Sequence, residues 1–204
     1  MLLQFGRARV FAVTTPAAAL IAGTIATSAV LGWLLDISLL KSVLPGAVEM
    51  KLNAALGMLA AAIALLHLSV APSGRGALPR TNVQAIGLLV AALGLLTVAE
   101  YVSGWNLGID EALVADNAGR FNAAKGRMSP YTATALLCIG TALFSLRRGW
   151  PDFVVRAPAV CTLCIGAISA IGYGWNASEL TTDVVLPPVA LNTAIALICL
   201  GAGC

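Results

Sequence analysis

The chain alternates between apolar stretches and short polar connections. The apolar stretches cover approximately residues 10–35, 52–71, 82–103, 130–146, 154–175 and 189–204. A helix of about twenty residues, rising about 1.5 Å per residue, crosses a hydrocarbon core of about 30 Å. The pattern therefore predicts an all-α membrane protein with six transmembrane helices.

A Gly-Trp pair lies at the end of the first, third and fifth apolar stretches. The glycines of these pairs are Gly32, Gly104 and Gly174, which stand 72 and 70 residues apart. A regular spacing of this size indicates an internal repeat, here one helical hairpin per unit. The three hairpins cover approximately residues 10–71, 82–146 and 154–204. Since all three have the same orientation, we expect one domain over residues 1–204, a bundle of parallel repeats about an axis along the membrane normal.

Local signals refine this picture at the helix ends and faces. Ser129 followed by Pro130 is typical of an N-cap and the first helical position. Residues 36–50 carry apolar side chains at helical spacing, which predicts a short interfacial helix interrupted at Pro45. The Ala- and Gly-rich runs 54–64 and 85–94 are expected to face inward, since small residues allow close helix approach in lipid.

Composition agrees with a membrane location, and the charges predict an orientation. The chain is 59% hydrophobic and 10% charged, against about 25% charged residues in ordinary soluble domains. The net charge of +3 gives no indication of nucleic-acid binding. One set of helix ends carries seven arginines and one aspartate: Arg7, Arg9, Arg75, Arg80, Arg147, Arg148, Arg156 and Asp152. Because short basic loops stay in the cytoplasm, both termini are predicted to be cytoplasmic and the Gly-Trp turns to lie outside, with their tryptophans in an interfacial aromatic belt.

Glu100 is the only carboxylate within a predicted transmembrane helix. Such residues usually face a cavity or a partner, since an ionised side chain is costly in lipid. One hypothesis is a ligand- or proton-sensing site below the outer mouth of the bundle, surrounded by Tyr101, Trp105, Trp33 and Trp175. The alternative is structural: Glu100 reaches water at the interface, or it pairs with Lys51 or Arg127.

Two asparagines occupy matching positions at helix starts, Asn53 and Asn192, with Tyr131 at the third. Their side chains can satisfy backbone donors of the first turn, or line a polar pocket at the repeat axis. The five cysteines lie in apolar runs and predict no disulfide framework. The single histidine, His67, has no second imidazole to share a metal or haem. We therefore expect no metal, no cofactor and no catalytic set within these residues.

Two segments resemble a known family. The segment 32–46, followed by Met50-Lys51-Leu52-Asn53, is similar to the N-terminal membrane region of bacterial sensor histidine kinases and GGDEF-type diguanylate cyclases. The segment 99–110, with Arg127-Met128-Ser129-Pro130, shares that resemblance. Helix starts in the family tend to read Pro-Asn-Thr-Ala, whereas Leu52 and Leu191 replace the proline here and Tyr131 replaces the middle asparagine.

The resemblance implies the N-terminal part of a longer, homodimeric protein of the bacterial inner membrane. The expected function is a membrane-embedded sensory or anchoring domain for signal transduction, of the histidine-kinase, two-component kind. It would pass a signal through its last helix to cytoplasmic modules of the same chain. Two alternatives stay open: a small transporter or channel, and a structural accessory subunit of a membrane complex. A transporter is expected to show several intramembrane polar residues and interrupted helices.

Overall fold

In the computed structural model the backbone is described for residues 2–44, 47–70, 80–116, 125–146, 150–174 and 188–204. All regular structure in these ranges is helical. The helices are α1 (Leu2–Leu34), α2 (Ser38–Lys41), α3 (Leu52–Val70), α4 (Arg80–Ser103), α5 (Pro130–Ser145), α6 (Asp152–Gly174) and α7 (Leu191–Gly203). The predicted all-α class is therefore confirmed, and six helices coincide with the six predicted apolar stretches.

The predicted helix ends are confirmed at α5 and differ after α1. Ser129 is the N-cap of α5, where its hydroxyl accepts a hydrogen bond from the Thr132 backbone N–H, and Pro130 follows it. The helix expected over residues 36–50 is a single turn, α2. Asp36, with a φ of 54°, ends the α1 helix, and Ser42 is extended. Its hydroxyl donates to the carbonyl of Leu44 at 2.7 Å, so a local side-chain bond replaces continued helix.

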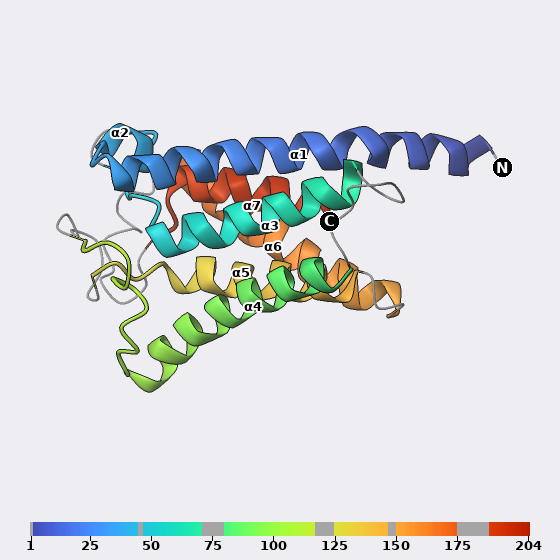
Figure 1. Cartoon of the computed structure of the whole chain (residues 1–204). Coiled ribbons are helices and arrows are strands. Elements are labelled where there is room, and N and C mark those ends of the chain that lie inside the picture. The colour runs from blue at the N-terminus through green and yellow to red at the C-terminus, as the bar shows by residue number, and fades with distance from the viewer. Residues whose placement is uncertain (1, 45–46, 71–79, 117–124, 147–149, 175–187) are drawn as a thin grey trace.

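The helices form an inner and an outer set (Figure 1). The inner helices α3, α5 and α7 contact one another. Each outer helix packs on its own partner and on the inner helix of a second hairpin. These contacts join α1 to α3 and α7, α4 to α5 and α3, and α6 to α7 and α5. The connections that follow α1 and α4 lie at one end of the bundle, and the two chain termini lie toward the other end (Figure 1).

Small residues permit the closest helix contact, between α4 and α5. A Cβ atom added to Gly87 would lie 2.6 Å from the backbone nitrogen of Phe144, and one on Gly94 would lie 2.5 Å from that of Leu137. Any larger residue would force the two backbones apart. Within the run 85–94, Gly87, Val90 and Gly94 are buried, whereas Ala85, Leu88 and Leu89 are exposed.

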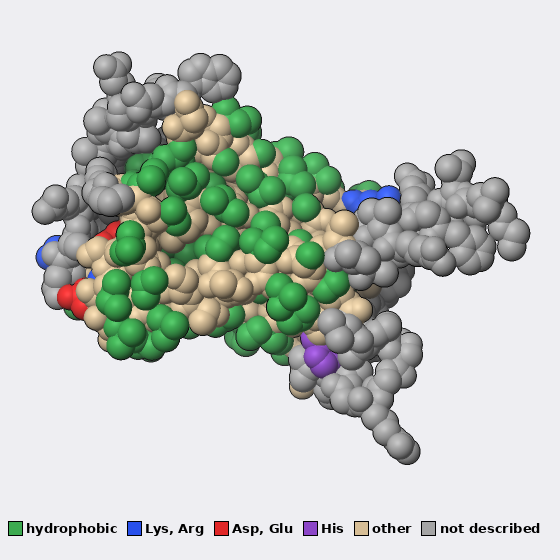
Figure 2. Space-filling model, turned by 90° about the horizontal axis from the view of Figure 1, so that it is seen from above, with side chains coloured by type: hydrophobic (Ala, Val, Ile, Leu, Met, Phe, Trp, Pro, Cys, Tyr) green, Lys and Arg blue, Asp and Glu red, His purple; other side chains and the backbone are tan. Residues whose placement is uncertain are grey.

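Length and composition suit a membrane protein. Four helices are long and apolar enough to cross a bilayer, within α1, α3, α4 and α6, while α5 and α7 are shorter apolar helices. Hydrophobic side chains cover much of the middle of the surface in Figure 2, whereas acidic side chains lie toward one end and basic side chains at both ends. Large apolar side chains are exposed on several helices, including Leu20 of α1, Leu89 of α4 and Ile168 of α6. In water such a surface would be unfavourable, whereas lipid would cover it.

Candidate functional site

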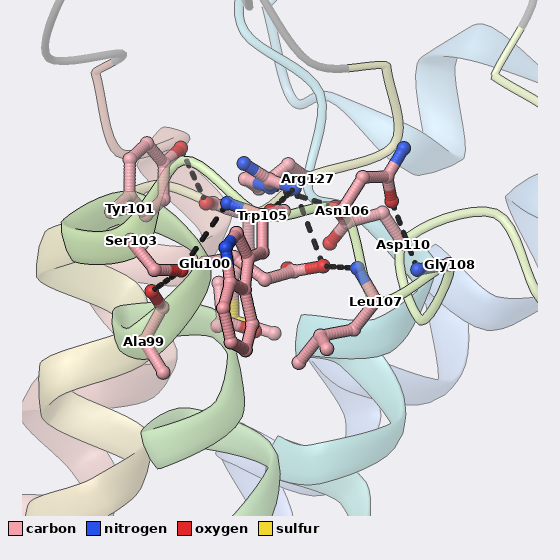
Figure 3. A network of polar contacts seen from close by, with 12 residues as sticks. Ala99, Glu100, Tyr101, Ser103, Trp105, Asn106, Leu107, Gly108, Asp110 and Arg127 are labelled. Atoms are coloured by element: carbon pink, nitrogen blue, oxygen red, sulfur yellow. Dashed lines mark hydrogen bonds and ion pairs between the residues drawn. The ribbon is translucent and has the colours of Figure 1, made fainter.

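The polar end of the bundle, where α4 ends and α3, α5 and α7 begin, holds the buried charges of the described residues. Glu100, Asp116, Arg127 and Lys41 are each at most 8% exposed there. Glu100, Asp110 and Arg127 form one connected group, the Arg127 network (Figure 3). Buried charges persist only where partners compensate them, so this network is the first place to look for function.

Glu100 is 1% exposed and lies in the last turn of α4. Its Oε1 atom accepts a hydrogen bond of 2.7 Å from the backbone N–H of Leu107 and lies 3.3 Å from Nη2 of Arg127. The chain turns back at Gly104, whose φ is 71°, and thereby covers the helix end. Pairing with Arg127, one of the structural alternatives, is confirmed, and access to water is not, because the 104–110 turn encloses the carboxylate.

Arg127 connects three parts of the polar end. Its Nε donates to Oδ2 of Asp110 at 2.7 Å, and its Nη2 donates to the carbonyl of Trp105 at 3.4 Å. The guanidinium also lies over the ring of Tyr101, with its carbon 5.4 Å from the ring centre. Burial alone would lower the pKa of Arg127, but the facing carboxylates outweigh this and raise it. The side chain is thus a permanent cation shared by two acids.

Asp110 is the second acid of the network and is bound from two sides. Besides Arg127, its Oδ1 atom faces Nδ2 of Asn53 at 3.5 Å, the outer limit of a hydrogen bond. Burial raises the pKa of Asp110, and the negative charge of Glu100 adds to this, although the hydrogen bond from Arg127 opposes it. Asp110 was not among the residues predicted from the sequence. Its only signal is a carboxylate in a polar loop that also carries Arg127.

Tyr101 and Trp105 flank the network in different ways. The Tyr101 hydroxyl donates to the carbonyl of Met128 at 3.0 Å, so its polar atom is engaged. Trp105 contributes its backbone carbonyl to Arg127, while its side chain is 71% exposed. Of the aromatic residues expected around Glu100, Tyr101 and Trp105 are therefore present. Trp175 lies outside the described residues.

Trp33 is not at the surface, contrary to the expected aromatic belt. Its side chain is buried, and its Nε1 donates to the carbonyl of Met50 at 2.7 Å. The ammonium groups of Lys41 and Lys51 lie 4.5 and 5.8 Å from the ring centre. The connection between α2 and α3 folds over the ring, which explains the burial. These partners differ from those of the Arg127 network.

A second ion pair holds the loop between α4 and α5 to the start of α3. Nζ of Lys51 lies 2.5 Å from Oδ2 of Asp116, which also accepts a hydrogen bond of 3.0 Å from the Gly126 backbone N–H. The two charged residues are 65 positions apart in the chain. The sequence shows both charges but not their pairing, because the loop path between them has no regular pattern.

The two asparagines have matching hydrogen bonds. The side-chain oxygens of Asn53 and Asn192 accept from the backbone N–H groups of Ala54 and Thr193, respectively. This confirms the expected role in satisfying first-turn donors. The amide of Asn192 also donates to the carbonyl of Lys41 at 3.0 Å. Each asparagine thus joins the start of an inner helix to a connection from another hairpin.

A small cavity of about 20 Å³ lies where the three inner helices begin. Its lining includes Lys51 and Arg127 together with the residues that follow the matched helix-start positions, Ala54, Thr132 and Thr193. A cavity needs about 10–15 Å³ to hold one water molecule, so this one is of water size. Asn53 and Asn192, which were expected to help line a polar pocket at the helix starts, are not among its lining residues.

The remaining candidates contribute no further centre in the described ranges. There, no three His, Cys, Asp or Glu side chains come close enough to hold a metal ion. All five cysteines are free thiols. Comparison with models of protein families, with curated proteins and with solved structures finds no match.

Proposed function

We propose that this chain is a membrane-embedded sensory domain of a bacterial signal-transduction protein, in which α7 carries the signal toward the cytoplasm. The observation that carries the proposal is the position of α7. It contacts α1, α3, α5 and α6, and Asn192 at its start donates a hydrogen bond to the carbonyl of Lys41, the last residue of α2. A rigid helix with such contacts can couple the polar end to the opposite end, if the packing has alternative arrangements.

The proposal includes six crossings in three parallel hairpins, with the polar end outside and both termini in the cytoplasm of the inner membrane. The cyclic packing of outer on inner helices supports a threefold repeat. The arginine-rich ends support the orientation. Homodimerisation and attached kinase or cyclase modules belong to the same proposal, through the resemblance at Gly32–Trp33 and Glu100–Asp110.

Fusing a reporter kinase module directly after Cys204 tests the signalling role of α7. One to four alanines inserted at the junction rotate the module by about 100° each, because a helix has about 3.6 residues per turn. Output that rises and falls with this period is expected. Asn192→Ala, which removes the hydrogen bond to the carbonyl of Lys41, should weaken the response. Kinase output that depends on neither the inserted alanines nor Asn192 would contradict signalling through α7. Flux of a solute across vesicles that contain the protein would favour the transporter alternative.

Topology is tested separately with a reporter enzyme active only in the periplasm. Fusions within 104–116 are expected to be active and fusions at either terminus inactive. The reverse result would overturn both the orientation and the direction of signalling.

A further inference from the structure

The Arg127 network contains two carboxylates and one guanidinium. Arg127 bonds Asp110 at 2.7 Å and faces Glu100 at 3.3 Å, and the three side chains are at most 9% exposed. If both acids are ionised, the network carries one uncompensated negative charge. Such a charge is costly away from water, and proteins usually supply a partner or neutralise the group.

One atom marks where compensation is missing. Glu100 Oε2 is buried and has no hydrogen-bond partner among the described residues. Glu100 also lies in the last turn of α4, where the helix dipole disfavours negative charge. The bond from the Leu107 N–H satisfies only the other oxygen, Oε1. The carboxyl groups of Glu100 and Asp110 are therefore both held at Arg127, and the open position of this site is the buried Oε2 atom of Glu100.

Among the described residues, the charged and titratable groups next to the pair are engaged elsewhere. On the α3 side, Lys51 pairs with Asp116. On the α4 side, the Tyr101 hydroxyl donates to Met128. Helix α5 carries no Asp, Glu, Lys, Arg or His, and its start is preceded by Arg127 itself. Glu111 accepts from the Asp116 backbone N–H. None of these described groups provides a second positive charge for Glu100 and Asp110.

We propose that Glu100 and Asp110 together hold one dissociable proton, which makes the Arg127 network a proton-binding site at the polar end of the bundle. One proton on either acid brings the network to neutrality. Burial is the largest cause that raises the pKa of Asp110, and a raised pKa likewise favours the protonated carboxyl group.

Proton release would return the network to a net negative charge. The network would then hold the 104–110 turn less firmly to α4 and α5. The use of this change as a stimulus rests on the proposed sensory function, whereas proton binding itself does not. External pH is then the stimulus, acting through the connection that joins α4 to α5.

Infrared spectroscopy of the whole protein in lipid vesicles tests the proposal without any signalling readout. A protonated carboxyl group has its own C=O stretching band, which shifts on transfer to D₂O. Ordinary carboxyl groups ionise near pH 4. We expect the wild-type protein to keep such a band well above that pH and to lose it in one step on further titration.

Three variants assign the band. Glu100→Gln and Asp110→Asn each leave one carboxylate facing one guanidinium, so both should abolish the band above about pH 5. Asp36→Asn, which removes an exposed carboxylate at the same end of the bundle, should leave it unchanged. If Glu100→Gln fails to fold, Asp110→Asn and the wild-type titration carry the test.

Three results would overturn the proposal. These are complete ionisation of the wild-type carboxyl groups by about pH 5, a band that neither network variant affects, and a midpoint that moves with sodium, potassium or ammonium concentration. The last result would mean that a monovalent cation, and not a proton, fills the open position. Because the readout is spectroscopic, each of these results leaves the signalling test at α7 independent.

Discussion

The turns of the first and second hairpins start from the same Gly-Trp sequence but enclose different side chains. In the first turn, Trp33 is buried and hydrogen-bonded to Met50, and the aspartate that pairs with Lys41 is 93% exposed. In the second, Trp105 is 71% exposed and the ion pairs lie inside. A shared motif therefore does not determine which side chain is enclosed. The path of the following loop determines it.

The two turns should differ most in stability when the cation of each ion pair is removed. Arg127→Met leaves two buried carboxylates without their partner and is expected to cost about 3–5 kcal/mol of unfolding free energy. Lys41→Met leaves only the exposed carboxylate of Asp36 without its partner, so it should cost less than Arg127→Met. Denaturant unfolding in detergent micelles measures both. Equal losses would mean that the two ion pairs do not differ in the way their burial indicates.

For the aromatic residues, the larger loss of stability is expected in the first turn and the smaller one in the second. Trp33→Phe removes the donor to the buried Met50 carbonyl and should cost about 1–3 kcal/mol. Trp105→Phe changes an exposed ring and should stay within about 0.5 kcal/mol. The same unfolding assay applies. A larger loss at Trp105 would indicate that its ring is enclosed in the membrane or by a partner.

Each turn also has a residue with a positive φ close to its Gly-Trp pair, Asp36 in the first turn and Gly104 in the second. At Gly104 the added Cβ would meet nothing within 4 Å, so Gly104→Ala should cost only the backbone term of about 1–2 kcal/mol. Asp36→Gly relieves the positive φ of 54° but also removes the acceptor of the hydrogen bond from Lys41, so its two effects on stability oppose each other. A rise in the unfolding midpoint of Gly104→Ala would show that the turn is not left-handed.

The smallest expected effects are the pH dependences of the two aspartates, which have opposite signs. Because the pKa of Asp110 is raised in the folded protein, its contribution to the free energy of unfolding is fully present below the ordinary pKa. That contribution is lost as the pH rises through the raised pKa. The hydrogen bond from Lys41 lowers the pKa of Asp36, so its contribution is present above the ordinary pKa and is lost as pH falls through the lowered value. Unfolding midpoints of Asp110→Asn and Asp36→Asn between pH 3 and pH 8 separate the two. Matching signs would contradict the burial of Asp110.

The sequence alone determined the helical class, the approximate helix bounds and the chemical character of the polar end. These follow from local rules: apolar length, capping at Ser129 and the amides at Asn53 and Asn192. Glu100 was also recognisable, since a lone acid in an apolar helix requires a partner.

Only the tertiary structure decided which partner that was and what surrounds it. The Asp110–Arg127 pair, the burial of Trp33 and the Lys51–Asp116 pair join residues across irregular loops. No periodic pattern in sequence encodes the path of such loops, because their conformation depends on packing against helices that are distant in the chain. The charge excess of the Arg127 network, and with it the proposed proton, becomes visible only when these loops are in place.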